Sequence, residues 1–389
     1  MKILIASDLH WPAVNGVATF SRNLAQGLAA RGHDVLVIAP SQTGKKYKEV
    51  DVNYAIVRTA AIPFPFYQNF MISLSPYREV KKIINEFQPD IIHIQMLMMI
   101  GQAAMKIGNK NGIPIVSTNH AMPENLMDNL KLLAPVARPI NYMLKRYGAR
   151  FHSKADYVTL PTKAAIEMFG SSVDKVTSPI EAVSNGIDLS RFEVSAPSSE
   201  IMEKFKIPTD VPIISYIGRL DAEKHLFVLL KAFEQILSKT KAHLLIVGFG
   251  TDADNLKLLA YESGLSKHIT FTGRVSDEEI VALHKVGTVY CMPSPAELQS
   301  IATLEAMASG QPIVAVNAGA LWELCQNERN GFLCNQDDDK QIAESLLKII
   351  TNPTLRKKMS LESISIANTH DLEHTLKRFE EIYTDLINA

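Results

Sequence analysis

Two pairs of charged residues in the second half of the chain have the types and spacing of a ligand site. Arg219 and Lys224 follow the apolar run 213–217 and a glycine. An arginine can hold two phosphate oxygens at once and a lysine adds a point charge, so this pair suits a diphosphate that gains charge as it leaves. Glu297 and Glu305 lie about two helical turns apart, and carboxylates so placed can accept hydrogen bonds from separate hydroxyl groups of one ligand.

Both pairs also have a structural explanation. Arg219 can pair with Asp221 or Glu223 on a solvated turn, and the local pattern alone favours that pairing. Glu297 can serve as a helix-start residue that the helix dipole stabilises. A surface position fits Glu305 poorly, because this residue lies within a mostly apolar stretch.

Three other features stand where predicted strands end or predicted helices begin. Gly16 comes just before a helix expected from about residue 18, where a glycine lets a ligand approach the backbone closely; an ordinary turn explains it equally well. The backbone amides near Gln299, Ser300 and Ile301 lie at another helix start and can hold phosphate. His120 follows an apolar run, and this position makes a functional role as plausible as a structural one.

The elements that must position these residues alternate regularly along the chain. Helical patterns separate short, wholly apolar runs, which indicates parallel sheet covered on both faces. Each half is therefore predicted to be an α/β domain of the doubly wound, Rossmann-like kind, whose ligands bind beyond the carboxyl ends of the strands. The expected strands are 2–6, 34–39, 55–58, 90–94, 113–118, 157–160 and 182–184 in the first half, and 213–217, 243–247, 269–271, 286–292, 313–316 and 331–334 in the second.

The length of 389 residues favours two domains. Loop chemistry around 195–199 predicts a first domain over 1–195 and a second over 196–369. The last stretch, about 370–389, has apolar residues at alternating spacings of four and three, which keeps them on one face of a helix. We expect that helix to pack back on the first domain.

Composition limits the class of protein. The hydrophobic fraction is 47% and the charged fraction 21%, as in a folded globular protein. Three cysteines are too few for a disulfide framework, and the sequence has no metal-ligand spacing and no P-loop. The N-terminus reaches a charge too soon for a signal peptide, and the longest uncharged apolar run, 91–105, is shorter than the roughly 20 residues of a membrane span.

Charge is divided unequally between the two halves. Residues 1–190 hold 20 Lys and Arg against 14 Asp and Glu, whereas residues 191–389 hold 20 against 27. A basic first half indicates an anionic partner, either nucleic acid or a membrane surface. An isoelectric point near 6.8 and the lack of a recognisable nucleic-acid module argue against nucleic acid.

Taken in chain order, the motifs resemble those of the retaining nucleotide-sugar glycosyltransferases of family 4. The matching stretches are Asn15-Gly16-Val17, 89–93, His120, 184–188, 218–224, and Glu297 with Glu305. The resemblance covers essentially all of 1–389 and implies the GT-B fold, in which two Rossmann-like domains face each other across a cleft. The stretch 120–126 is similar to the branch that glycosylates diacylglycerol or related lipids at the inner membrane face.

The resemblance also implies a role for each candidate residue. The second domain would bind the donor and the first the acceptor. Arg219 and Lys224 would hold the donor diphosphate, with Gly16 against it. The helix start at 299–301 is a further candidate for binding the donor. The other implied roles are His120 at the sugar near the reacting carbon, Glu297 at hydroxyls of the transferred sugar, Glu305 at the ribose hydroxyls, and Val275 at the base through its backbone. The implied catalytic residues are His120, Arg219, Lys224 and Glu297.

The implied activity is that of a hexosyltransferase, which moves a hexosyl unit from a UDP- or GDP-hexose to an acceptor hydroxyl with retention. The acceptor is expected to be a membrane lipid such as diacylglycerol, and the protein to be cytoplasmic and peripheral on the inner face of the plasma membrane. No cofactor or metal is required, because two cations already meet the diphosphate. The alternatives are a soluble or polysaccharide acceptor, a nucleotide-sugar epimerase or sugar-phosphate synthase, and a catalytically silent sugar-nucleotide-binding protein, against which the intact charged pairs argue.

Some positions depart from the family pattern. His10 and Trp11 stand where the family often has Tyr or Phe with a small neighbour, and the residues 321–323 replace a common Ile/Val-Pro-Glu. The run 247–250 is similar to part of a dinucleotide fingerprint but lacks the third glycine, so it indicates little by itself.

One segment of the first half has the pattern of a membrane-surface helix. Between 129 and 155 apolar residues interleave with six basic ones and no acidic one; the basic residues are Lys131, Arg138, Lys145, Arg146, Arg150 and Lys154. Such a segment can lie at an interface with its cations toward anionic lipid, and the aromatic run 64–70 can add contact. A core-packing helix with a solvated basic face explains the pattern equally well.

Overall fold

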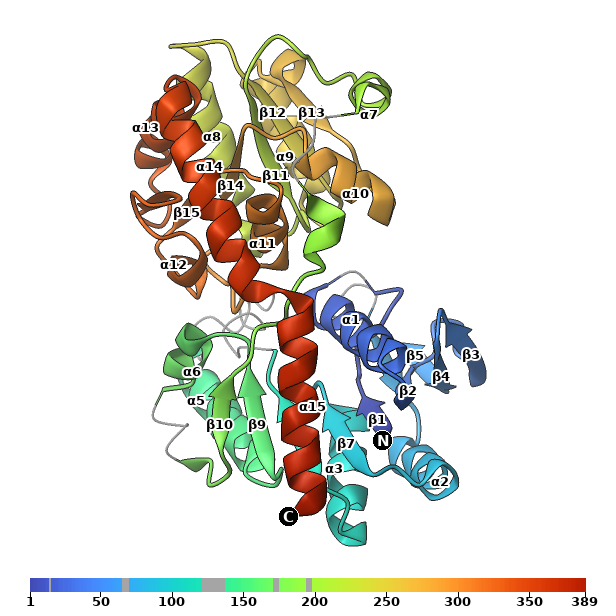
Figure 1. The fold of residues 1–389 in the computed structure, drawn as a ribbon. Helices are drawn as coiled ribbons and strands as arrows, with labels where there is room; N and C mark the ends of the chain where they lie inside the picture. Colours follow the sequence, from blue (N-terminus) through green and yellow to red (C-terminus); the bar gives the residue numbers. More distant parts are fainter. Residues whose placement is uncertain (14, 65–69, 121–136, 171–174, 194–197) are drawn as a thin grey trace. The chain divides into compact units, whose positions relative to one another are not determined.

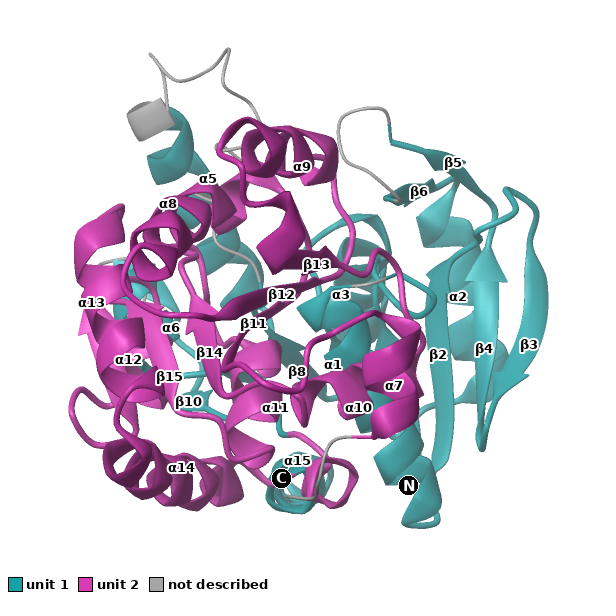
Figure 2. Ribbon diagram, turned by 90° about the horizontal axis from the view of Figure 1, so that it is seen from above, with its two compact units in different colours: residues 1–186, 372–389 teal, residues 187–371 magenta. Residues whose placement is uncertain are grey.

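The computed structural model describes the chain except for residues 14, 65–69, 121–136, 171–174 and 194–197 (Figure 1). Contacts within the described chain divide it into two compact units (Figure 2). The first unit consists of residues 1–186 with 372–389, and the second of residues 187–371. The boundaries predicted from the loop chemistry and the last helix are 195 and 369, which lie within ten residues of these.

The first unit is built on an eight-stranded sheet with the order β10-β9-β8-β7-β1-β2-β4-β3. Its strands are β1 (Lys2–Ala6), β2 (Asp34–Pro40), β3 (Tyr47–Asp51), β4 (Tyr54–Thr59), β7 (Ile91–Ile94), β8 (Ile115–Thr118), β9 (Tyr157–Leu160) and β10 (Ile180–Ala182), and β5 (Ala61–Pro63) pairs separately with β6 (Met71–Ser73). The described α-helices of this unit are α1 (Gly16–Ala30), α2 (Pro76–Phe87), α3 (Met99–Asn111), α5 (Ala137–His152), α6 (Lys163–Phe169) and α15 (Leu372–Asn388).

The edge strand β3 departs from the expected all-parallel sheet, because it runs antiparallel to β4. Its side chains alternate between half-buried and exposed positions, unlike those of the buried parallel strands. Val52 and Asn53 join β3 to β4 in a tight turn, and Val52 has a φ of 55°. An edge strand with one face in water needs no continuous apolar run, which is why the apolar pattern missed it.

The second unit is built on a six-stranded sheet, wholly parallel, with the order β13-β12-β11-β14-β15-β16. This order is that of a dinucleotide-binding Rossmann domain, and it confirms the doubly wound α/β prediction. The strands are β11 (Ile213–Ile217), β12 (His243–Val247), β13 (Ile269–Phe271), β14 (Val289–Met292), β15 (Ile313–Val316) and β16 (Gly331–Cys334). The α-helices are α7 (Ser199–Lys204), α8 (Leu226–Leu237), α9 (Ala253–Glu262), α10 (Asp277–His284), α11 (Ile301–Ala308), α12 (Leu321–Leu324), α13 (Asp339–Ile350) and α14 (Pro353–Ala367).

The last helix, α15, completes the core of the first unit. Leu376, Phe379 and Tyr383 are buried on one of its faces, as the alternating spacing predicts. Gly27 of α1 makes room for this packing, because a Cβ there would overlap the side chain of Leu376. Arg378 of α15 pairs with Glu181 of β10 at 2.8 Å.

Each unit has its own hydrophobic core between sheet and helices. In the second unit every residue of β11, β12, β14 and β15 is buried, so these strands need apolar side chains on both faces. Among the helices of the described ranges, none combines the length and apolar content of a bilayer span.

Candidate functional site

In each sheet the strand order reverses at one point, between β1 and β7 in the first unit and between β11 and β14 in the second. Open α/β sheets bind ligands beyond the carboxyl ends of the strands that flank such a point. In the second unit the loops that follow β11 and β14 carry Arg219, Lys224 and Glu297. These predicted site residues therefore share one edge of the sheet.

The loop after β11 is held by close backbone packing. A Cβ on Gly248 would overlap the carbonyl oxygen of Gly218, and one on Gly250 would overlap the backbone of Leu220. The Tyr216 hydroxyl donates to the carbonyl of Arg219 at 2.8 Å. The glycines of the run 247–250 therefore let two loops approach each other, which explains them without a dinucleotide fingerprint.

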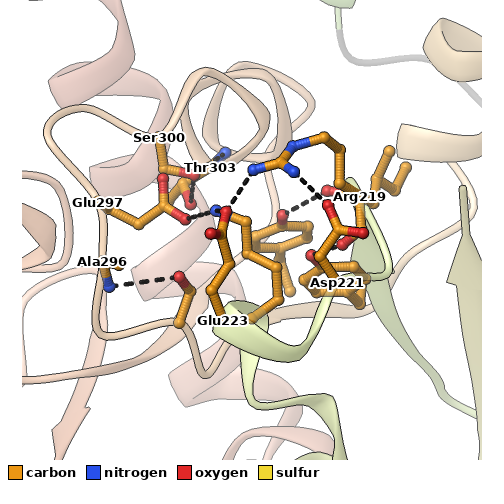
Figure 3. Close-up of polar contacts among 12 residues, drawn as sticks. Arg219, Asp221, Glu223, Ala296, Glu297, Ser300 and Thr303 are labelled. Carbon is orange, nitrogen blue, oxygen red and sulfur yellow. Dashed lines mark hydrogen bonds and ion pairs between the residues drawn. The ribbon is translucent and has the colours of Figure 1, made fainter. Parts of the chain in front are cut away.

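Arg219 and Lys224 both pair with carboxylates of their own unit. Arg219 donates to Asp221 and to Glu223 (Figure 3). Lys224 Nζ donates to Glu297 Oε1 at 2.7 Å. Lys224 Nζ also lies 3.9 Å from Glu223 Oε1, and the Glu223 side chain is only 5% exposed. Two cations and three carboxylates thus form one connected network.

This network contains the local pairing that the sequence left open for Arg219, and it adds a pairing of Lys224 that the sequence did not predict. Arg219 makes the local pairs with Asp221 and Glu223, whereas Lys224 and Glu297 meet across 73 positions of sequence. Since three carboxylates face two cations, an anion gains the full charge of a cation only by displacing a carboxylate. A diphosphate that bound here would have to displace a carboxylate from Arg219 or Lys224.

Glu297 is fixed through its backbone by the loop after β15. Its carbonyl oxygen accepts a hydrogen bond from the N–H of Ala320 at 2.8 Å. Gly319, with a φ of 55°, lies so close that a Cβ would overlap the Glu297 backbone. Trp322, which stands where the family pattern has proline, follows in α12. It is 41% exposed, so its side chain points away from the core.

Helix α11 begins just beyond Glu297 and has an ordered N-terminus. Ser300 caps the helix, and its hydroxyl accepts from the N–H of Thr303 at 3.3 Å. Gln299 and Ser300 are buried, while Ile301 is half-buried. The first amides of a helix lack partners within the helix, so this end of α11 can bind an anion.

Glu305 lies on the same helix, with its side chain 18% exposed. Its Oε2 is 3.2 Å from Nε2 of His284, the last residue of α10. The carboxylate is therefore held from inside the unit, which excludes the surface position. The sequence offered no indication of His284, because a histidine at a helix end has many structural explanations.

Val275 comes after β13 and packs against the core of the second unit while half-buried. Beside it, the Arg274 guanidinium lies 3.8 Å from the centre of the Phe249 ring. A bridge between Gly248 and Gly273 joins the two loops that carry these residues. The pair places a cation over an aromatic ring next to the loop after β11.

In the first unit, His120 follows β8 and Gln95 follows β7. His120 Nε2 lies 2.9 Å from Gln95 Oε1, and the His120 and Phe20 rings lie 4.9 Å apart. Desolvation lowers the pKa of His120 to about 3, so the imidazole is neutral at pH 7. Sequence reasoning missed Gln95, although its place just after the matching stretch 89–93 is a strand end.

The two departures from the family pattern, His10 and Trp11, are anchored groups. His10 Nδ1 lies 3.0 Å from Ser21 Oγ and its Nε2 lies 2.9 Å from the Tyr54 hydroxyl. Burial lowers the pKa of His10 to about 3. The Arg22 guanidinium covers the Trp11 ring at 4.1 Å from its centre. Both departures therefore serve to hold the loop after β1.

That loop ends at α1, which begins at the exposed residue Gly16 with Asn15 as its cap. At its other end, the Asp8 carboxylate accepts from the N–H groups of Ile100 and Gly101 at 2.9 and 3.2 Å. Desolvation raises the pKa of Asp8 to about 6 despite these hydrogen bonds. The first unit thus presents Gly16 from a loop tied to the start of α3.

Some predicted features lie outside the described residues. These are 121–126 of the lipid-type stretch, 65–69 of the aromatic run, and Lys131. Within the ranges that the structure describes, no group of three or more His, Cys, Asp or Glu is placed to hold a metal ion.

Comparison with known proteins gives two family matches. Residues 14–191 match the family described as Glycosyltransferase Family 4, and residues 197–364 match Glycosyl transferases group 1. The alpha-monoglucosyldiacylglycerol synthase of Streptococcus pneumoniae is 25% identical over 393 residues, covering 100% of this chain and 86% of that protein.

Solved structures of similar proteins share the fold. Sucrose-phosphate synthase from Thermosynechococcus elongatus superimposes with a TM-score of 0.79 at 18% identity, covering 100% of this chain and 99% of the other. The Anabaena protein HepE, solved with UDP and glucose, has a TM-score of 0.75 at 18% identity, covering 99% and 100%. Both the family matches and the architecture confirm the resemblance seen in the motifs. The chain belongs to the family 4 glycosyltransferases and has the GT-B fold.

Proposed function

We propose that this glycosyltransferase moves a hexosyl unit from a nucleoside-diphosphate sugar to a hydroxyl group of a membrane lipid such as diacylglycerol, with retention. The observation that carries the donor half is the network of Arg219, Lys224 and Glu297 beside the strand-order reversal of the second unit. The likeness to HepE, solved with UDP and glucose, supports a nucleotide-sugar donor. UDP and GDP are both candidates.

In the proposed reaction, the bond between the anomeric carbon and the diphosphate oxygen breaks, and its electron pair leaves with the diphosphate. Arg219 and Lys224 stabilise the charge that appears there, and one well-placed group of this kind contributes about 3–4 kcal/mol in comparable sites. The acceptor oxygen bonds to the same face of the carbon. Because the acceptor oxygen attacks that face directly, no protein nucleophile is needed, and the acceptor proton passes to an oxygen of the leaving phosphate.

The remaining groups position the donor. When the diphosphate binds Lys224, Glu297 loses its pairing with that cation and binds hydroxyls of the transferred sugar. Neutral His120 contacts the sugar near the reacting carbon. Glu305 is assigned to the ribose hydroxyls and Val275 to the base. The amides of 299–301 are assigned to the diphosphate, as is Gly16.

The activity is tested with labelled UDP-glucose and GDP-mannose on the full chain, with and without diacylglycerol in vesicles. One nucleoside diphosphate and a labelled glycolipid should appear only when the lipid is present, and the product should keep the anomeric configuration of the donor. Turnover with soluble sugars but not with diacylglycerol would contradict the lipid acceptor. An inverted product would contradict retention.

The lipid acceptor is supported by the exposed face of α5 as well as by the named relative. Tyr142, Met143 and Tyr147 are 58%, 68% and 43% exposed. Arg146 and Arg150 are exposed on the same helical face, since the five positions follow one another at spacings of one and three. An exposed aromatic face with two cations and no acidic neighbour on its helix suits an anionic lipid surface.

The exposure of the basic residues on α5 indicates which of them a membrane-binding experiment should change. Lys145 turns inward, where its Nζ donates to the carbonyl of Met168 at 3.3 Å. Arg146 and Arg150 are therefore the pair to reverse to Glu, with the exposed Lys81 and Lys82 of α2 reversed as the matched control.

Co-sedimentation uses vesicles of phosphatidylcholine alone and of an equal mixture with phosphatidylglycerol. Binding should rise with the anionic lipid and fall with salt. R146E/R150E should lose at least about tenfold in affinity, since each basic residue near such a surface contributes about 1 kcal/mol. Equal losses in K81E/K82E would assign the effect to net charge rather than to α5.

A further inference from the structure

His284 is a buried histidine whose side chain reaches the Glu305 carboxylate from behind. Its relative exposure is 0%, and its Nε2 lies 3.2 Å from Glu305 Oε2. The two residues come from consecutive helices of the second unit, α10 and α11, 21 positions apart. The contact is thus internal to one unit.

The geometry decides which ring nitrogen carries hydrogen. An ionised carboxylate only accepts hydrogen bonds, so Nε2 must carry the hydrogen that lies between the two groups. Nδ1 is buried and has no hydrogen-bond partner among the described residues. A proton there would be a buried donor without an acceptor, so the Nε2–H tautomer fits this site.

The imidazole cannot easily turn away from Glu305. The Phe192 ring meets it edge-on, with centres 5.7 Å apart, and the Tyr290 ring lies 6.2 Å away. Its backbone is fixed as well, because the carbonyl of His284 accepts from Gln311 Nε2 at 2.7 Å. Gln311 Oε1 in turn accepts from Ser215 Oγ at 2.7 Å, so the support extends to strand β11.

We propose that His284 is a positioning residue for nucleotide recognition: its Nε2–H holds one oxygen of Glu305, so that the carboxylate presents a fixed geometry to the two hydroxyls of a ribose. This rests on the proposed function, in which Glu305 binds the ribose. A free glutamate side chain must lose rotamer freedom on binding, whereas a carboxylate already held by His284 loses less.

The experiment measures, by calorimetry on the full chain, the affinity for UDP and for its 2′,3′-dideoxy analogue, or for the guanosine pair if GDP binds better. The wild type should prefer the nucleotide with both hydroxyls. Glu305→Ala should abolish that preference. His284→Leu should lower the affinity for the full nucleotide about tenfold and remove most of the preference, with kcat little changed because ribose contacts are equal in the ground and transition states.

Two polar variants separate positioning from packing. In His284→Gln the amide nitrogen stands near the position of Nε2 and should restore the preference. In His284→Asn the amide stands near Nδ1, too short to reach Glu305, and should not. This pair carries the test even if the leucine variant fails to fold.

The outcomes also distinguish the two proposals. If Glu305→Ala discriminates between the nucleotides like the wild type, the ribose role of Glu305 is wrong and the proposed function loses that residue. If Glu305→Ala behaves as expected but the glutamine and asparagine variants are alike, His284 acts only through packing and the positioning role is overturned.

Discussion

Arg219 and Lys224 are charged groups whose function depends on what they pair with. Each is already engaged by a carboxylate, Arg219 by Asp221 and Glu223 and Lys224 by Glu297. A surface pair of this kind contributes little to stability, but a half-buried one next to developing charge changes the energy of that charge strongly. In the proposed mechanism, replacing either cation is therefore expected to affect turnover more than folding.

Arg219→Ala and Lys224→Ala should each lower turnover by about 10²-fold or more, because each removes positive charge from the proposed diphosphate site. Steady-state kinetics with the labelled donor measures this. The controls are Arg329→Ala and Lys204→Ala, which break exposed ion pairs with Glu362 and Glu279 in the same unit. Near-normal turnover in both site variants would remove these residues from the mechanism.

At the scale of elements, the loop after β11 depends on a glycine of the next loop. Gly248 has a φ of 132°, and a Cβ there would overlap the Gly218 carbonyl. Gly264 also has a positive φ, 70°, but a Cβ there meets nothing within 4 Å. Substituting alanine at each of these two glycines therefore separates the effect of an unfavourable backbone conformation from the effect of displacing the loop after β11.

Gly248→Ala should lower turnover by about 10²-fold, since a shift of about 1 Å in a positioned group has that cost. Gly264→Ala should keep turnover and lose only about 1–2 kcal/mol of stability through its left-handed backbone. The comparison requires kinetics and thermal unfolding of both variants. Equal turnover in the two would mean that the loop tolerates the shift.

Helix α15 is the other element with a testable role, because Phe379 joins it to the sheet of the first unit. Phe379 is 0% exposed, and its ring lies 5.0 Å from the His93 ring and 5.9 Å from the Phe20 ring. Phe379→Ala should lower the free energy of unfolding of the first unit by about 3–5 kcal/mol. Ile387→Ala, at a 37% exposed position of the same helix, should change it by no more than about 0.5 kcal/mol.

The unfolding of the first unit can be followed separately. The sequence has two tryptophans, Trp11 in the first unit and Trp322 in the second. In a Trp322→Phe background, urea unfolding monitored by fluorescence reports the surroundings of Trp11. An unchanged midpoint in Phe379→Ala would show that α15 contributes little to this core.

At the scale of the whole molecule, buried histidines make stability depend on pH. Desolvation lowers the pKa of His10, His93 and His120 to about 3 and that of His152 to about 4. A histidine of the unfolded chain has a pKa of about 6.5, so below that pH the unfolded state binds protons that the native state does not bind. Asp8 acts in the opposite direction, since its raised pKa, about 6, lets the native state bind a proton first.

The first unit should therefore lose stability as the pH falls from about 6.5 toward 4, with a net slope of about 4 kcal/mol per pH unit from roughly three protons. Urea unfolding at pH 7, 6 and 5 measures the slope. His152→Gln should reduce it by about 1.4 kcal/mol per pH unit, whereas the exposed His374→Gln should leave it unchanged. A flat profile in the wild type would mean that these histidines open to water.

The sequence by itself determined the class of fold and where a site must lie. Runs such as 243–247 are apolar at every position because both faces of a parallel strand are covered, so the strands can be found one by one. Residues that follow such runs lie at the carboxyl ends of strands, and this placed Arg219, Lys224 and Glu297 at one sheet edge before any contact was known. The face of α15 was likewise fixed by local spacing alone.

Only the tertiary structure decided which side chains meet. Lys224 reaches Glu297 across 73 positions, His284 reaches Glu305 across 21, and the His93 Nδ1 lies 2.5 Å from the Tyr383 hydroxyl across 290. These pairings follow from the order in which strands neighbour one another, and local periodicity carries no information about that order. Local periodicity failed to predict β3 for the same reason, because β3 is a strand by virtue of its place at the edge of the sheet rather than its own composition.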